Sequence, residues 1–246
     1  MRKHRRVGFL SVCLLIPAVA LVPAAGCGQN TLHVTTDAVE TRAQWEAEMI
    51  LPVENIQQMP EQPSGCEITS TTIVLNYIGC EITKTELADY FQIGGLPRRS
   101  GGVVVGPDPW KKFAGSPAED GYGCFAPVVT QAANRYFSSE RLSRRAVNLS
   151  GTKAGDLFDY IDRGIPVIVW ATISMKEPYE GDGWYLEGTK EYFRWPAREH
   201  CLVLIGHSGN DAVFSDPLDP RGTVRYDFSL FEARYRQLFC QAVVLE

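Results

Sequence analysis

Residues 62–79 read QPSGCEITSTTIVLNYIG and carry the strongest structural signal in the chain. The pattern Ser64-x-x-Glu67 is typical of a helix-capping box, and the apolar residues that follow it predict a helix over 66–78. Cys66 would then lie in the first turn, where free backbone N–H groups and the helix dipole favour a thiolate. The stretch therefore makes Cys66 a candidate nucleophile. On this stretch alone it could equally be a small buried residue or half of a disulfide.

The rest of the chain shows helical patterns first and strand patterns afterwards. Further helices are expected over 84–91 and 125–137, and the Gly/Pro-rich segment 93–123 is expected to be a long loop at the rim of a cleft. The second half predicts strands at 144–148, 165–174, 189–194, 200–206, 211–215 and 241–245, and helices at 154–162 and 228–237. This order predicts an α+β fold, with an N-terminal helical half packed on a C-terminal antiparallel sheet.

The first 27 residues have the features of an export signal. They combine a basic start, an apolar run and small residues before Cys27. The apolar run is shorter than the roughly 20 residues that a membrane-spanning helix needs. The ending Ala-Ala-Gly-Cys resembles the bacterial lipoprotein box, in which Cys27 would receive a lipid; ordinary cleavage and an uncleaved anchor are the alternatives. We expect a signal peptide of the lipoprotein type at 1–27, a tether with a short helix near 42–49 at 28–50, and one domain at 51–246.

Charge and cysteine content narrow the possible partners. Beyond residue 27 the chain has 20 basic and 29 acidic residues, a net charge of −9, which argues against a nucleic-acid partner. Five cysteines lie in the expected domain: Cys66, Cys80, Cys124, Cys201 and Cys240. If Cys66 is the free thiol, the other four could form two disulfides in any of three connectivities, or none. No pair has CxxC spacing, so no metal site and no cofactor is expected.

A histidine and an aspartate are expected to meet in a hairpin. His200 begins an apolar run, and a Ser-Gly-Asn turn separates this run from a second strand that ends at Asp216. If residue 206 pairs with residue 211, His200 and Asp216 lie nearly opposite each other at the open end of the hairpin. A carboxylate there can orient one imidazole nitrogen and leave the other for a thiol. The alternative is a strand-end histidine and an ordinary turn aspartate before Pro217.

Two further cysteines and one further histidine are possible members of the site. His207 is expected to face solvent at the turn, and Cys201 is expected to point to the face of the strand opposite His200. Cys124, which also precedes a predicted helix, is the second candidate for the nucleophile. Most aromatic residues of the segments 93–123 and 176–198 are expected to pack within those segments rather than bind a ligand.

Four segments resemble the C39-like peptidases, bacterial relatives of the peptidases that remove double-glycine leaders from bacteriocins. They are QMPEQPSGCE at 58–67, LNYIG at 75–79, EHCLVLIG at 199–206 and SDP at 215–217. The resemblance runs from about Leu51 to the C-terminus. It implies a papain-like fold and a triad of Cys66, His200 and Asp216.

The resemblance also implies a glutamine that helps bind the oxyanion. Gln58 fits this position best, with Gln57 and Gln62 as alternatives. The leader peptidases carry Asp-Cys-Gly around the nucleophile, whereas this chain has Gly-Cys-Glu, which argues against a double-glycine substrate.

These observations predict an exported, monomeric cysteine peptidase. It would act on peptide or isopeptide bonds of a peptide or protein at the cell surface, at the extracytoplasmic face of a bacterial membrane or in secreted form. An N-terminal lipid or signal anchor would be its membrane contact. Two alternatives keep the same residues: a cell-wall amidopeptidase or transpeptidase, and a surface binding lipoprotein with a vestigial triad.

Overall fold

The computed structural model describes residues 47–246. The expected signal peptide, most of the expected tether and most of the helix expected near 42–49 lie outside these residues. The last residue of that helix, Met49, lies in strand β1 (Met49–Ile50) instead. In the described part, no helix is long and apolar enough to cross a membrane.

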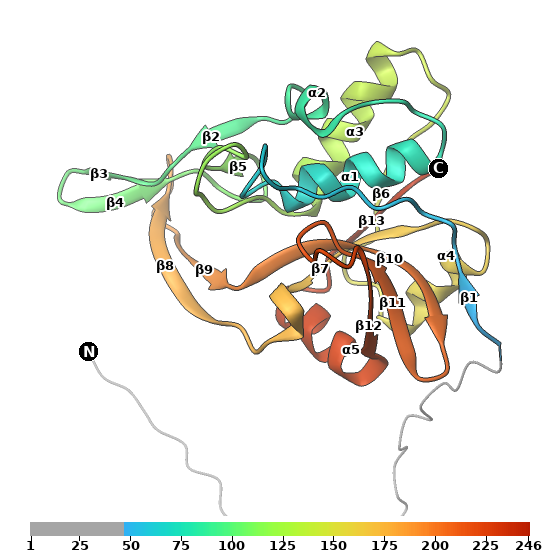
Figure 1. Cartoon of the computed structure of the whole chain (residues 1–246). Helices are drawn as coiled ribbons and strands as arrows, with labels where there is room; N and C mark the ends of the chain where they lie inside the picture. Colours follow the sequence, from blue (N-terminus) through green and yellow to red (C-terminus); the bar gives the residue numbers. More distant parts are fainter. Residues whose placement is uncertain (1–46) are drawn as a thin grey trace, which may run out of the picture. The chain divides into compact units, whose positions relative to one another are not determined.

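A seven-stranded antiparallel sheet forms the centre of the fold (Figure 1). Its strand order is β12-β11-β10-β7-β13-β6, with β1 paired to β10. The strands are β6 (Ala146–Asn148), β7 (Val167–Thr172), β10 (Glu199–Ser208), β11 (Asp211–Ser215), β12 (Thr223–Asp227) and β13 (Ala242–Leu245). The central strands β7 and β10 are apolar along most of their length because both of their faces are covered.

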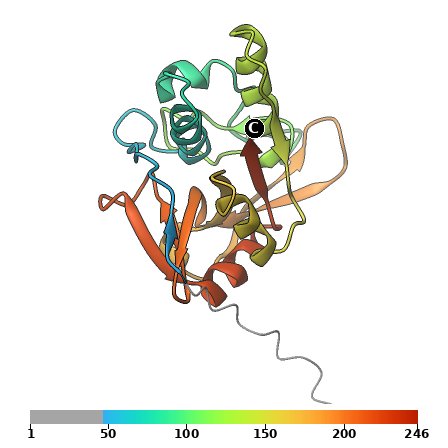
Figure 2. The same cartoon turned by 90° about the vertical axis from the view of Figure 1, so that its right-hand side faces the viewer.

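Helices cover the two faces of this sheet (Figures 1 and 2). Helices α1 (Cys66–Tyr77), α2 (Lys84–Ala88) and α3 (Ala126–Ser139) lie on one face. The other face carries the 3₁₀ turns η1 (Gly155–Leu157) and η2 (Ile173–Met175) with helices α4 (Phe158–Ile161) and α5 (Phe228–Gln237). Side chains alternate along β7, so that Trp170 joins the α1 and α3 core and Val169 joins the opposite core. The predicted α+β arrangement is confirmed, and the second helical layer completes it.

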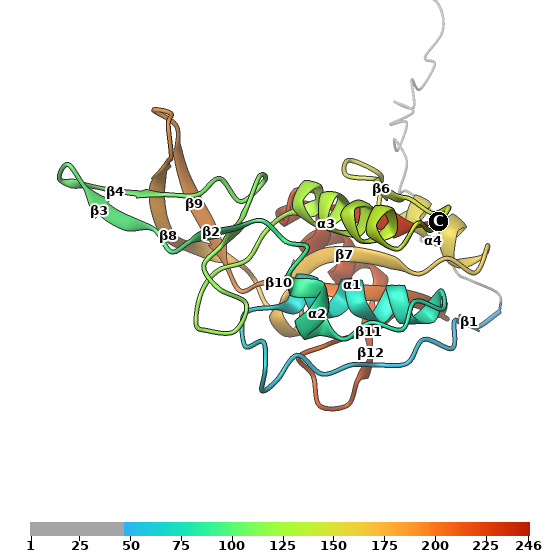
Figure 3. The ribbon, with the colours of Figure 1, turned by 90° about the horizontal axis from the view of Figure 1, so that it is seen from above.

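A smaller sheet extends from one side of the molecule (Figure 3). It has the order β3-β4-β8-β9 and consists of β3 (Arg98–Ser100), β4 (Val103–Gly106), β8 (Tyr179–Leu186) and β9 (Tyr192–Ala197). A further short parallel pair joins β2 (Ile93–Gly95) to β5 (Phe113–Ala114). The prediction that 93–123 is a long loop is therefore wrong in its secondary structure, although Gly121 and Tyr122 of this segment do line the pocket described below. Residues Val105 and Tyr185 pair across 80 positions of sequence, a contact that local patterns do not reveal.

The aromatic residues of these segments pack mostly against one another, as expected. Trp110 lies with its ring centroid 4.3 Å from that of Phe125, and Tyr122 lies 4.8 Å from Trp184. Trp195 stacks on Phe125 at 5.4 Å. This aromatic cluster joins the small sheet to the α1 and α3 core.

The β10–β11 hairpin differs in register from the prediction. Gly206 pairs with Val213 rather than with residue 211, and a bulge follows at residues 204–206. The turn has only two residues, and Gly209 adopts a positive φ of 61° that suits such tight hairpins. Despite the shifted register, the strand ends still bring His200 to Asp216, as the next subsection describes.

The predicted capping box at the start of α1 is wrong. The N-cap residue is Gly65, which has no side chain to accept a hydrogen bond. Ser64 instead donates to the carbonyl of Glu119, and Glu67 turns toward Cys124. A complete capping box occurs at α2, between Thr83 and Glu86.

Candidate active site

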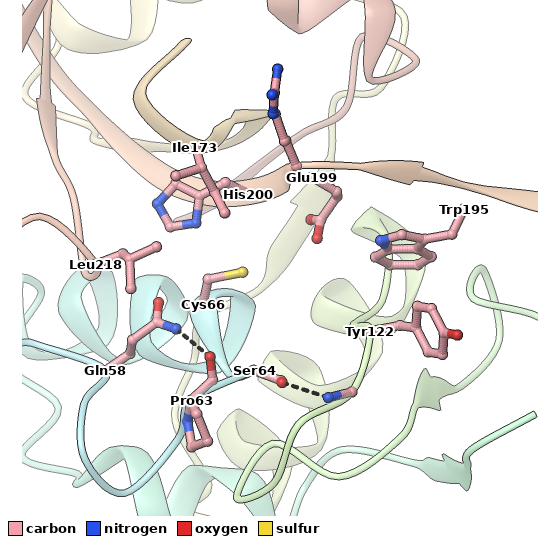
Figure 4. A pocket seen from close by; sticks show the side chains of 12 residues that line it. Gln58, Pro63, Ser64, Cys66, Tyr122, Ile173, Trp195, Glu199, His200 and Leu218 are labelled. Carbon is pink, nitrogen blue, oxygen red and sulfur yellow. Dashed lines mark hydrogen bonds between the residues drawn. The ribbon is translucent and has the colours of Figure 1, made fainter. Parts of the chain in front are cut away.

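A pocket of about 220 Å³ lies at the N-terminus of α1 (Figure 4). The segment before α1, the 121–122 turn and the junction of β9 with β10 supply its walls. The residues that matter for its chemistry are Gln58, Cys66, Tyr122, Trp195, Glu199 and His200. The structure thus brings together Cys66 and His200, which are 134 positions apart in the sequence, in one pocket.

His200 and Asp216 form a buried pair. The Nε2 atom of His200 lies 2.7 Å from Oδ1 of Asp216, and the side chains are 2% and 5% exposed. Asp216 Oδ1 also accepts hydrogen bonds from the N–H groups of Leu218 and Asp219. Burial acts to raise the Asp216 pKa, but the His200 contact and these two N–H groups lower it below its usual range. Asp216 is therefore a carboxylate that fixes the orientation of the imidazole.

The backbone around Asp216 is tied to the segment that precedes α1. The side-chain amide of Asn55 donates to the carbonyl of Asp216 at 3.0 Å and to Ser215 Oγ at 2.9 Å. The N–H of Gln58 donates to the carbonyl of Pro217 at 2.8 Å. These contacts hold the end of β11 against the chain that leads to Cys66, and so couple the two halves of the site.

The thiol of Cys66 is turned away from His200. It donates to Glu67 Oε2 at 3.3 Å and accepts a hydrogen bond from the N–H of Cys201 at 3.4 Å. In Figure 4 the sulfur points to the side of Glu199, and the imidazole lies on its other side. Burial, followed by the charges of Glu67 and Glu199, raises the Cys66 pKa well above its usual value.

This result differs from the thiolate expected at a helix N-terminus. The helix dipole stabilises a thiolate by roughly 0.3 to 1 kcal/mol, which is less than one pKa unit. Burial, in contrast, can raise a pKa by several units. In this side-chain conformation, burial and the neighbouring carboxyls prevail, and Cys66 is a neutral thiol.

Glu67 and Glu199 are the site residues that the sequence analysis missed. Burial raises the pKa of Glu67 to about 7, although the hydrogen bond that Glu67 accepts from the N–H of Cys124 lowers this pKa in part. Burial and the charge of Glu67 raise the pKa of Glu199 well above its ordinary range. Both residues adjoin a triad candidate in the sequence, in Cys66-Glu67 and Glu199-His200, and that adjacency was the available signal.

Gln58 is the one of the three candidate glutamines that lines the pocket. Its side chain is 2% exposed, and Nε2 donates to the carbonyl of Pro63 at 2.9 Å. The amide of Gln57 instead donates to Asn55 and to the carbonyl of Asp219, and that of Gln62 to the carbonyl of Lys84. Geometry therefore favours Gln58 for a role beside Cys66.

The other cysteines do not form an alternative site. Cys124 is fully buried, and its carbonyl accepts a hydrogen bond from the indole of Trp170. It does not line the pocket that Cys66 lines. All five cysteines within residues 47–246 are free thiols. The side chain of Cys201 packs in the core between the sheet and α1. Because side chains alternate along a strand, the neighbouring His200 is expected on the other face.

The expectation for His207 is wrong. Its side chain is only 5% exposed, and Nε2 lies 3.3 Å from Asp162 Oδ1. The ring centroids of Phe158 and His207 lie 5.8 Å apart, and Met49 of β1 is the strand partner of His207. Because β1 and α4 cover this end of β10, a residue beside the turn becomes buried.

This chain is similar in sequence and structure to several known proteins. The Peptidase_C39 like family matches residues 50–243. The chain is 28% identical over 194 residues to the uncharacterised protein YvpB of Bacillus subtilis (strain 168), covering 78% of this chain and 73% of that protein. A crystal structure described as that of a C39-like peptidase from Bacillus anthracis is 27% identical, with a TM-score of 0.70, covering 82% of this chain and 98% of that one.

A more distant likeness concerns the peptidase domain of Streptococcus ComA. It is 15% identical with a TM-score of 0.45, covering 78% of this chain and 97% of that domain. The Bacillus anthracis structure shows that the mixed α+β architecture is the papain-like fold of C39 peptidases. Since the family match spans most of the 246 residues, the chain belongs to the Peptidase_C39 like family.

Proposed function

We propose that this protein is a cysteine peptidase in which Cys66 is the nucleophile, His200 the base and Asp216 the residue that positions the histidine. The observation that carries the proposal is the 2.7 Å contact between His200 Nε2 and Asp216 Oδ1, beside a pocket that Cys66 also lines. With Nε2 engaged by Asp216, Nδ1 of the same ring is left for the thiol. This is the division of roles that a thiol-imidazole-carboxylate triad requires.

The proposed reaction has two steps. The Cys66 thiol transfers its proton to His200 as the sulfur attacks a peptide carbonyl, and the imidazolium then protonates the leaving amine. Water, activated by His200, releases the acyl group from Cys66. Asp216 stays ionised throughout and stabilises the imidazolium, consistent with its lowered pKa.

The oxyanion of each tetrahedral intermediate needs donors close to Cys66. Gln58 lines the pocket, and its Nε2 carries a second hydrogen beyond the one donated to Pro63. The N–H of Cys66 lies in the first turn of α1, where intrahelical acceptors are lacking. Together these two donors could stabilise the oxyanion, a contribution of about 3 to 4 kcal/mol in measured cases.

Catalysis also requires a change in the Cys66 side chain. In the described conformation, its thiol donates a hydrogen bond to Glu67 and points away from His200 (Figure 4). Rotation about the Cα–Cβ bond would carry the sulfur toward the imidazole, where the charge pair can form. We infer that the described conformation is a resting state.

The proposed place of action rests on the N-terminal sequence. The basic start, apolar run and Ala-Ala-Gly-Cys ending support export with a lipid on Cys27, and so a peptide or protein substrate outside the cytoplasm. The monomeric state and the absence of a nucleic-acid partner are part of the same proposal, the latter supported by the acidic composition.

Hydrolysis of unfolded casein or a peptide library, with new termini read by mass spectrometry, tests this function. Cleavage should disappear in Cys66→Ala and fall by at least about 10²-fold in His200→Ala. The matched control is Cys124→Ala, which removes a buried thiol that does not line the pocket and should leave cleavage unchanged. Cleavage that survives in Cys66→Ala would refute the proposal. Adding an amine acceptor identifies a transpeptidase, because transfer gives a new amide in place of a free acid.

One observation favours the alternative of a surface binding lipoprotein with a vestigial triad. The pKa of the Cys66 thiol is raised well above its usual value in the described conformation. Under that alternative, Cys66 would react no faster than an ordinary thiol near neutral pH. The same peptide library would then bind without being cleaved.

A further inference from the structure

Cys66, Glu67 and Glu199 converge on one point beside the pocket. One ligand atom from each residue lies within 4.8 Å of the other two. The three residues are 6%, 0% and 8% exposed, respectively. Three buried groups that can each become negative repel one another unless protons or a cation neutralise them.

A second observation shows that one of these groups lacks a partner. Oε1 of Glu199 is buried and makes no hydrogen bond to any described residue. In Figure 4 the Glu199 carboxyl is directed toward the sulfur of Cys66. A buried acceptor costs free energy when it is left unpaired, so Glu199 Oε1 is available to a ligand that enters between it and the sulfur.

The distances suit a small cation with a tetrahedral shell. Cys66 Sγ lies 3.3 Å from Glu67 Oε2. Two such ligands on one Zn²⁺, bound at about 2.3 Å for sulfur and 2.0 Å for oxygen, would lie about 3.5 Å apart. The adjoining pocket of about 220 Å³ leaves room for a water as fourth ligand.

Neighbouring N–H groups already orient two of the three ligands. The N–H of Cys124 donates to Glu67 Oε1, which leaves Oε2 for the cation. The N–H of Cys201 donates to the Cys66 sulfur. Such outer contacts fix the direction of metal ligands. One thiolate with two carboxylates suits Zn²⁺ better than Mg²⁺ or Ca²⁺, which bind oxygen ligands in larger numbers.

We propose that Cys66, Glu67 and Glu199 form a binding site for Zn²⁺. Binding replaces the thiol proton and the protons held by the Glu67 and Glu199 carboxyls, all of which pass to water. It holds the thiolate on the side of Glu199, away from His200. No CxxC spacing predicts this site, because its ligands are one cysteine and two glutamates. The consequence that zinc reversibly inhibits hydrolysis rests on the proposed function, whereas the binding itself does not.

Competition with a chromogenic zinc chelator, on the metal-stripped full chain near pH 7.5, measures the site directly. We expect one equivalent of Zn²⁺ to bind. Cys66→Ser and Glu199→Gln should each weaken binding by at least about 10- to 100-fold, the loss that follows even when only an outer partner of a metal ligand is removed. His200→Ala and the control Glu180→Gln, a change at an exposed residue of β8, should stay within about threefold of the wild type. Co²⁺ in place of Zn²⁺ should give a thiolate charge-transfer band that Cys66→Ser removes.

Two results would overturn the proposal: a wild-type chain that binds no zinc, or His200→Ala weakening binding as much as Glu199→Gln does. The second result would mean a cysteine-histidine metal pair instead. Glu67→Gln gives an independent ligand variant should Glu199→Gln fail to fold. Since none of these readouts needs a substrate, a chain that binds zinc here but cleaves no peptide upholds the site and contradicts the peptidase.

Discussion

Glu67 connects the thiol of Cys66 to the backbone of Cys124. Burial raises the Cys66 pKa most, and the charges of Glu67 and Glu199 raise it further. Replacing Glu67 by Gln keeps an amide oxygen for the Cys124 N–H but removes the charge beside the thiol. We therefore expect Glu67→Gln to speed the alkylation of Cys66 by iodoacetamide near pH 7, in chelator-treated protein, by about tenfold.

The control for this change is Glu180→Gln, which removes an exposed carboxylate that is not among the charges acting on the Cys66 thiol. Labelling should be read at Cys66 itself by mass spectrometry, because Cys80 and Cys240 also have free thiols. An unchanged or slower rate in Glu67→Gln would show that this carboxyl does not restrain the thiol.

Asp216 supports both the imidazole and the local backbone. Its Oδ1 accepts from the N–H groups of Leu218 and Asp219 and contacts His200. Asp216→Ala leaves these donors unpaired and should lower the free energy of unfolding by about 1 to 3 kcal/mol, measured by urea denaturation. Asp216→Asn keeps an oxygen acceptor at the same place and should lose less. Equal losses in both variants would mean that the charge, rather than the acceptor, stabilises this turn.

At the scale of elements, the lack of a side chain at Gly206 lets β1 approach β10 closely. A Cβ atom added at Gly206 would lie only 2.2 Å from the carbonyl oxygen of Met49. Gly206→Ala should therefore displace β1 and cost about 1 to 3 kcal/mol of unfolding free energy. The matched control is Gly155→Ala, because the nearest atom to its added Cβ belongs to Phe228 at 3.9 Å.

Hydrogen exchange separates a local from a global effect of Gly206→Ala. Faster exchange at residues 49–51 with unchanged protection of β7 is the expected pattern. If the amides of β1 exchange as slowly in Gly206→Ala as in the wild type, the close approach is not what limits this position.

The elements that sequence patterns predicted are those with a strong local signal. The helix over 228–237 and the strand over 211–215 match α5 and β11, and the helix predicted to begin at Cys66 does so. Strand β3 was missed because it is short, polar and exposed, so it shows no alternating apolar pattern. Strands β4 and β8 were missed, and they pair with each other across a long stretch of sequence that local patterns do not reveal.

The site shows the same division. His200 and Asp216 could be placed together because the hairpin is a local feature, and the helix start made Cys66 a candidate by itself. Only the resemblance to C39-like peptidases joined Cys66 to the other two, because no local pattern links residues 134 positions apart. The proximity of Glu67 to Glu199 could not be predicted, because it depends on how α1 packs against β10. Burial of these two charged residues follows from that packing, and sequence patterns normally indicate the opposite for glutamate.

Across the whole molecule, buried acids make stability depend on pH. The Glu67 pKa is about 7 in the folded chain against an ordinary value of 4.5, so the folded state holds more protons between these values. The free energy of unfolding should therefore fall as pH rises from 4.5 to 7, by about 3 kcal/mol from this residue. The raised pKa of Glu199 acts in the same direction.

Asp216 has the opposite sign. Its lowered pKa stabilises the fold above the unfolded value of 3.8, and this contribution is lost as pH falls further. Urea denaturation in a chelator buffer should show maximal stability near pH 4.5 to 5, and Glu67→Gln should flatten the decline toward pH 7. Parallel pH profiles for the wild type and Glu67→Gln would contradict this account.

The position of the site follows from the packing of helices on the central sheet. Helix α1 lies on one face of the central sheet, and the start of β10 brings His200 to the edge of the same pocket. The central claim is that Cys66 and His200 act as one chemical unit. The rate of Cys66 alkylation by iodoacetamide across about pH 5 to 9, in the wild type and in His200→Ala, tests it most directly. The account predicts a rate near pH 6 that falls at least about tenfold in His200→Ala; equal rates in the two proteins over the whole range would contradict it.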